Sequence, residues 1–172
     1  MSSGTAERGK PALGPDHALL SARVVAAALL VSGATAAVIG TVLTLPDAEL
    51  MPERDYGSLL FFLWVASAIG ATAGWWMLWR RAAGLATEPR ARVEIEAGRL
   101  HPGLVLTRLI AGWALLEGQL MIALAVSILG RTPMLLVPSL TVFAIGILLS
   151  FPRREWFVPF ARGPREPLPP AR

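Results

Sequence analysis

Residues 109–129 read LIAGWALLEGQLMIALAVSIL, and this stretch decides the fold. Its 21 residues include a single ionisable side chain, Glu117. A helix rises about 1.5 Å per residue, so about 20 apolar residues cross a hydrocarbon core about 30 Å thick. Lipid offers no hydrogen-bond partner to a bare backbone, and a helix satisfies its own polar groups. The stretch therefore predicts a transmembrane helix.

Three other apolar stretches have similar lengths, at about residues 24–45, 58–79 and 134–151. None of the four contains Lys, Arg or His. Only 16% of the residues are charged, whereas a soluble domain has about 25%. We therefore expect an all-α integral membrane protein, with a four-transmembrane-helix bundle over residues 23–151. Pro138 should kink the last of these helices one turn after it starts.

Basic residues predict how the helices are oriented. Of the 16 Lys and Arg side chains, 14 lie in residues 1–23, 80–108 and 152–172, and only Arg54 and Arg131 lie on the other side. Cytoplasmic loops collect Lys and Arg, so both termini and the loop at 80–108 should be cytoplasmic. The same topology explains the net charge of +4 without nucleic acid as a partner. We expect the bacterial cytoplasmic (inner) membrane as the location.

The polar segments outside the predicted helices have three expected forms. Residues 1–22 are rich in Gly, Pro and Ser and predict a disordered cytoplasmic tail. Residues 152–172 predict a Pro- and Arg-rich cytoplasmic tail, with 156–160 (WFVPF) dipping into the lipid headgroups. Within the loop, 92–97 alternates charged and apolar residues, which is compatible with a short strand or with a helix on the membrane surface.

Tryptophans gather near the predicted cytoplasmic boundary. An indole buries its ring and still donates a hydrogen bond, which suits a membrane interface. We therefore interpret five of them as interface anchors: Trp75, Trp76, Trp79, Trp113 and Trp156.

Small residues recur at spacings that place them on one helix face. Such faces let backbones approach closely in lipid, where no hydrophobic force drives helices together. They predict packing within this chain, with a dimer face as the alternative. The residues are Ser32, Ala36 and Gly40 in the first helix, Ala66, Gly70 and Gly74 in the second, and Ala114 and Gly118 in the third.

Glu117 is the strongest candidate for a chemical role. A charge near the bilayer centre costs about 2.5–3.5 kcal/mol on insertion scales, and no predicted helix carries a cation to offset it. We expect a neutral carboxyl that bonds to Gln119 or to a hydroxyl of a neighbouring helix. The candidate hydroxyls are those of Ser32, Thr35, Thr41, Ser67 and Thr72. Two hypotheses follow: Glu117 fixes the register of the bundle, or it carries protons or another cation across the membrane.

The segment Ala114-Leu115-Leu116-Glu117-Gly118 resembles the carboxylate helix of rotary ATP synthase c subunits over about 20 residues. That resemblance implies that Glu117 carries a proton. The rest of this chain departs from that family. Its second predicted helix has only Gly70 and Gly74 where the family has a longer glycine repeat, and its connecting loop is far longer. The chain is more similar to small four-span bacterial membrane proteins with the same Ala-Leu-x-Glu-Gly signature.

Other chemistry has little support in the sequence. The chain has no cysteine, and its two histidines, His17 and His101, are far apart, so we expect no metal site and no cofactor. No nucleophile elbow or phosphate-binding loop is present, so we expect no enzyme. The expected partners are the lipid bilayer, and this chain itself or another membrane protein through the small faces. A structural or accessory helix-packing protein is the favoured function, and proton translocation through Glu117 is the alternative.

Overall fold

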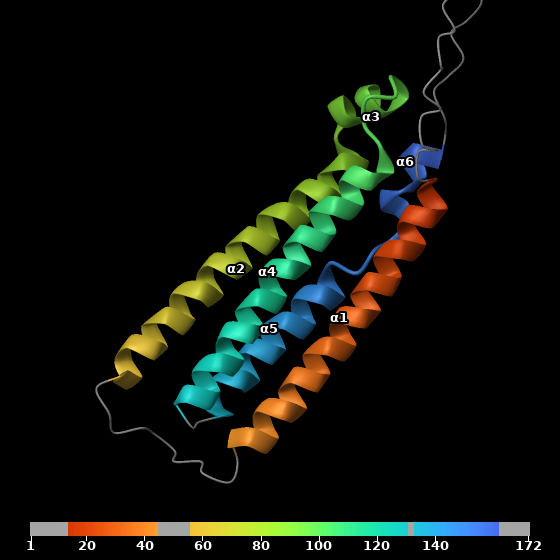
Figure 1. Cartoon of the computed structure of the whole chain (residues 1–172). Coiled ribbons are helices and arrows are strands. Elements are labelled where there is room, and N and C mark those ends of the chain that lie inside the picture. Colours follow the sequence, from red (N-terminus) through yellow and green to blue (C-terminus); the bar gives the residue numbers. More distant parts are fainter. Residues whose placement is uncertain (1–13, 45–55, 131–132, 162–172) are drawn as a thin grey trace, which may run out of the picture.

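The computed structural model describes residues 14–44, 56–130 and 133–161, and every regular element in these ranges is a helix (Figure 1). The long helices are α1 (Pro15–Thr44), α2 (Tyr56–Thr87) and α4 (Pro102–Leu129), and α5 (Leu136–Leu149) is shorter. Short helices connect or follow them: α3 (Pro89–Glu96), η2 (Pro133–Leu135), η3 (Arg154–Trp156) and α6 (Val158–Ala161). The chain is all-α over the part that the structure describes.

Three of the described helices are long and apolar enough to cross a membrane, at Pro15–Thr44, Ser58–Leu85 and Pro102–Leu129. The fourth apolar helix, α5, has 14 residues and spans about 21 Å at 1.5 Å per residue. Three of the four predicted stretches therefore lie in helices that are long and apolar enough to cross a membrane.

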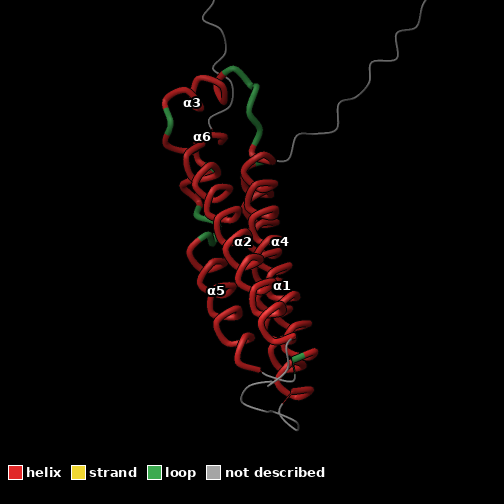
Figure 2. The backbone as a smooth tube through the Cα atoms, turned by 90° about the vertical axis from the view of Figure 1, so that its left-hand side faces the viewer, coloured by secondary structure: helices red, strands yellow, loops and turns green. Residues whose placement is uncertain are grey.

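Helix α4 lies at the centre of the bundle. It packs against α1, α2 and α5, and these helices run roughly along one common axis (Figures 1 and 2). Its buried residues recur every three or four positions, which is the spacing of one helix face. They are Val105, Leu109, Trp113, Leu116 and Leu120, all at most 2% exposed. Helix α4, which contains the apolar stretch at 109–129, is therefore the core of the fold.

Glycines set how closely α5 approaches its neighbours. The Phe143 ring of α5 occupies the place that a Cβ on Gly33 of α1 would need. Likewise, Leu116 of α4 fills the place of a Cβ on Gly146. These two positions bring the backbones of α1 and α5 within reach of neighbouring side chains, as small residues do in membrane bundles.

The first helix starts earlier than the predicted boundary at residue 23. Pro15 has the φ angle that a first helical residue needs, and Asp16 places a negative charge in the first turn. Ala18, Leu19 and Ala22 are buried on one face, which gives this segment a packing role. The predicted disordered tail is therefore wrong for residues 15–22, and residues 1–13 lie outside the described part.

The predicted loop at 80–108 is mostly helical. Helix α2 continues to Thr87 and α4 begins at Pro102, so α3 and its flanking turns are all that lies between them. Glu88 and Pro89 start α3, and Gly98, at φ 70°, ends it in the left-handed region that suits glycine. The alternative left open for residues 92–97 is thus decided in favour of a helix as far as Glu96.

The last apolar helix does not contain the predicted kink. A 3₁₀ turn, η2, precedes α5, and Pro138 falls in the first turn of α5, where a missing N–H breaks no helical hydrogen bond. After α5, the chain folds back against the bundle, with Pro152, Trp156 and Phe157 buried. The predicted tail from residue 152 is therefore structured as far as Ala161.

Candidate functional site

Glu117 faces α1 and accepts a hydrogen bond from Ser32. The Ser32 hydroxyl lies 3.1 Å from the Glu117 Oε1 atom, and the contact is half-buried. Within the described ranges the one ion pair joins Arg153 and Glu155, at 3.5 Å, near the other end of the chain. A hydroxyl, and no cation, is therefore the partner that the structure gives Glu117.

Gln119 lies on a different side of α4 from Glu117. Its Nε2 donates to the Ser139 hydroxyl of α5 at 3.0 Å, and Trp64 of α2 donates to the same oxygen at 2.8 Å. Ser139 in turn donates to the Leu135 carbonyl at 2.8 Å. One serine thus joins three helices, because a hydroxyl has one proton to donate and two lone pairs that accept.

Ser150 repeats this arrangement about three turns further along the chain. Trp75 of α2 and Trp113 of α4 donate their indole N–H groups to its oxygen at 3.2 and 2.8 Å. Ser150 donates to the Gly146 carbonyl at 2.5 Å. Trp64–Ser139 and Trp75–Ser150 are both separated by 75 residues, so α2 and α5 pair in parallel at one constant offset. We call Ser139, Ser150 and their four donors the serine seam.

The serine seam changes the role of two tryptophans. Trp75 is 6% and Trp113 is 0% exposed, and both indoles end on Ser150 inside the bundle. Trp156 is also buried, at 7% exposed. The interpretation of Trp75 and Trp113 as interface anchors is therefore wrong, because their indole N–H groups bond to a hydroxyl inside the bundle. For Trp156, the burial of its side chain is what contradicts the same interpretation. Trp76 stays exposed and Trp79 is half-buried, beside Arg80.

Sequence reasoning missed Trp64, Ser139 and Ser150. A signal was present in the sequence, because the Trp64-to-Trp75 spacing in one helix equals the Ser139-to-Ser150 spacing in another. Eleven residues make about three turns, so each pair lies on one helix face. Equal spacings on two helices allow both donors to meet both acceptors, and the observed pairs show that the two helices run parallel.

Three of the other hydroxyls predicted as candidate partners of Glu117 bond elsewhere. Thr35 and Thr41 donate to the carbonyls four residues earlier in α1, at 2.9 and 2.8 Å. Ser67 donates to the Trp64 carbonyl at 2.8 Å. Within the described residues, Ser32 is the member of that set whose hydroxyl bonds to Glu117. Glu117 and Gln119 thus belong to two separate contacts, one to α1 and one to α5.

The small-residue faces divide into two groups. In α1, Ala36 and Gly40 are buried, and a Cβ on Gly40 would lie 2.6 Å from Leu136 of α5. In α2 and α4, by contrast, Ala66, Gly70, Ala114 and Gly118 are exposed. A Cβ on Gly70 or Gly118 would have no neighbouring atom within 4 Å among the described residues. The prediction that Ala66, Gly70, Ala114 and Gly118 pack within the chain is therefore wrong. Gly74, by contrast, does pack within the chain, against Leu115.

Across residues 14–44, 56–130 and 133–161, no three His, Asp or Glu side chains gather in a way that could hold a metal ion. The candidate site is thus built from hydroxyl, indole, amide and carboxyl groups between apolar helices. The class of fold that holds this site is a helical bundle in which three of the described helices are long and apolar enough to cross a membrane.

Comparisons with protein-family models, with curated proteins and with solved structures gave no match to this chain.

Proposed function

We propose that this chain is a structural or accessory protein of the bacterial inner membrane, which packs its own helices and those of a second copy. The observation that carries the proposal is the contrast at its glycines. Side chains of neighbouring helices fill the place that a Cβ on Gly146 or Gly33 would need, while a Cβ on Gly70 or Gly118 would meet none of the described residues within 4 Å. Close-approach positions that the chain does not use itself remain open to another helix.

The proposal includes four membrane crossings with both termini in the cytoplasm. Helix α5 together with η2 runs from Pro133 to Leu149. With about 2.0 Å per 3₁₀ residue and 1.5 Å per α residue, the two elements span about 27 Å, close to the thickness of the hydrocarbon core. The basic residues of α3, η3 and the α2 end then lie on the cytoplasmic side.

The surface offered to the second copy lies along the outer edge of the α2–α4 contact. Gly74 lies against Leu115, and Gly112 lies against Trp75, so the two helices are antiparallel neighbours here. One turn along each helix from these contacts, Gly70 and Gly118 come to nearly the same height. We call Ala66, Gly70, Ala114 and Gly118 the glycine seam.

A second copy is the partner that the glycine seam itself supplies. Small faces pack best against small faces, and two copies related by a two-fold axis would bring identical seams together. The apolar surroundings of the seam, such as Ile69 at 66% and Ile122 at 36% exposed, suit contact within lipid.

Disulfide cross-linking in membranes tests this proposal, because the native chain has no cysteine. We expect A66C and A114C to form cross-linked dimers on oxidation. V38C is the matched control, since Val38 of α1 is 63% exposed and lies outside the seam. Cross-linking of V38C as efficient as that of A66C, or monomers in every variant, would contradict the proposal.

Glu117 serves in this proposal as a polar contact that holds α1 to α4. The Ser32 hydroxyl at 3.1 Å supports that role, and Gln119 bonds to a different helix. The alternative is proton translocation, which a carboxyl at this depth could support. Proton flux in proteoliposomes separates the two: we expect wild type and E117Q to match empty vesicles. Flux in wild type that E117Q abolishes would establish transport instead.

A further inference from the structure

A cleft of about 980 Å³ lies where α2 ends, between its last turns and η3. Basic, acidic and aromatic side chains all line it: Arg80, Arg81, Glu88, Glu155, Trp76 and Trp79. The apolar length of α2 gives way to charge at this point, which is where lipid headgroups meet a membrane helix. The cleft therefore lies at headgroup level.

The charges of the cleft are not paired across it. The ion pair within the described ranges joins Glu155 to Arg153, on exposed side chains, and leaves Arg80, Arg81 and Glu88 outside any ion pair there. The Arg80 guanidinium lies 5.8 Å from the Trp76 ring centroid, over its face. The Trp79 Nε1 atom is shielded from solvent and has no hydrogen-bond partner among the described residues. The cleft thus offers donors and cations beside carboxylates.

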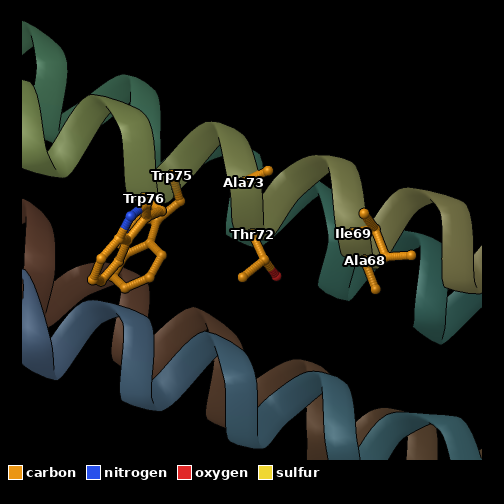
Figure 3. Close-up of a pocket in the computed structure, with 6 residues that line it drawn as sticks. All are labelled: Ala68, Ile69, Thr72, Ala73, Trp75 and Trp76. Atoms are coloured by element: carbon orange, nitrogen blue, oxygen red, sulfur yellow. The ribbon is translucent and has the colours of Figure 1, made fainter.

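An apolar groove of about 640 Å³ continues from this cleft along α2. Ala68, Ile69, Thr72, Ala73, Trp75 and Trp76 line it, and Trp76 lines the cleft as well. Figure 3 shows Thr72 and the two tryptophans extending from α2 toward the side on which α5 runs. From Arg80 to Ala68 the helix rises about 18 Å, close to the depth of one leaflet, about 15 Å.

We propose that the cleft and the groove together bind one diacyl phospholipid whose headgroup carries a phosphate and a primary ammonium, as in phosphatidylethanolamine. Arg80 and Arg81 contact the phosphate, with the Trp79 N–H as a further donor. Glu88 contacts the ammonium, and Glu155 exchanges its exposed ion pair with Arg153 for the same group. One acyl chain lies along the groove against Thr72. Two cations and two carboxylates around one cleft match a zwitterion better than a headgroup of net negative charge.

The charge balance also separates this lipid from its commonest alternatives. Phosphatidylglycerol has no cation to place beside Glu88 and Glu155, and carboxylates near a phosphate repel it. Phosphatidylcholine has a cation, but its trimethylammonium group has no N–H to donate to a carboxylate. Phosphatidylethanolamine is therefore the headgroup that uses both sets of side chains.

Native mass spectrometry of the full-length protein, with each lipid added in detergent, tests the proposal. We expect phosphatidylethanolamine to bind about tenfold more tightly than phosphatidylglycerol or phosphatidylcholine, and R80Q/R81Q to lose about tenfold of that binding. R90Q/R92Q removes the same charge from α3, outside the cleft, and should bind like wild type. Equal losses in the two double variants would mean unspecific attraction to basic residues and would overturn the proposal.

Two further variants test the halves of the site separately. E88Q/E155Q changes exposed side chains only, and we expect it to bind phosphatidylglycerol at least as tightly as phosphatidylethanolamine. T72F fills the groove and should weaken the lipid about fivefold while soluble glycerophosphoethanolamine binds unchanged. Unchanged lipid preference in E88Q/E155Q, or inorganic phosphate that displaces the lipid at equal concentration, would overturn the proposal. Circular dichroism checks that each variant folds.

Discussion

The two faces of the α2–α4 pair are built in opposite ways. The face toward α5 carries large side chains whose N–H groups end on two serine hydroxyls, Ser139 and Ser150. The opposite face carries the glycine seam, where a Cβ on Gly70 or Gly118 would meet no other described residue within 4 Å. Both faces belong to the same two helices and are surrounded by apolar residues, so hydropathy alone does not distinguish them.

The difference shows how contacts are fixed in lipid. Apolar surface has a similar free energy against lipid and against protein, so it does not determine which helices pack together. On the α5 side, indole and amide donors need acceptors and find them at two fixed heights, which determines a unique partner. On the other side, no polar group demands a partner, and only the shape of the small residues favours one.

Filling a glycine on the α5 side should have the largest effect. In G146L the new side chain would collide with Leu116 and approach Trp75, and we expect about 2–4 kcal/mol of lost stability. Unfolding in a detergent mixture, followed by circular dichroism, measures it. G118L is the matched change on the glycine seam and should alter the stability of the monomer by less than about 1 kcal/mol. Equal losses in both would remove the distinction between the two faces.

Removing a shared acceptor should have the next largest effect. S150A leaves the Trp75 and Trp113 indoles without their partner, and we expect about 2 kcal/mol of lost stability in the same assay. S127A is the control, because the Ser127 hydroxyl is fully buried without a partner among the described residues. If S127A lost as much as S150A, cavity formation rather than hydrogen bonding would explain both.

The contact between Ser32 and Glu117 should contribute least. Single hydrogen bonds between membrane helices average about 0.6 kcal/mol, so S32A should lose about that amount. T41A is the control, since Thr41 bonds to its own helix and is exposed. A loss in S32A as large as that in S150A would show that α1 depends on Glu117 more than the geometry indicates.

The sequence was sufficient for the helices and insufficient for their faces. Residues 109–129 and their three counterparts predicted where helices run, because hydropathy follows directly from residue type. Residues 80–87 and 102–108 belong to the predicted loop but are helical in the structure. Charged residues end a hydropathy signal, but they do not end a helix. Pro15 and Gly98 marked true helix boundaries that hydropathy did not reveal.

The site was harder to predict because small and polar residues do not reveal their partners. Gly40 and Gly70 occupy similar patterns in the sequence. Yet Gly40 lies against Leu136, while a Cβ on Gly70 would meet no other described residue within 4 Å. Ser32 was among several hydroxyls considered for Glu117, and only the packing of α1 on α4 selected it. Trp75 and Trp113 are of a residue type that is common at membrane interfaces. They are buried here because both indoles donate to Ser150, which lies much later in the chain.

The position of the two serines has a consequence for biogenesis. Ser139 and Ser150 bracket the last apolar helix of the chain, and their donors on α2 and α4 are synthesised earlier. Until that helix leaves the ribosome, four N–H-bearing side chains have no final acceptor in the bilayer. In the proposed topology of four membrane crossings, insertion of α5 therefore completes both serine contacts at once, and a nascent chain that stops before Pro133 would lack them.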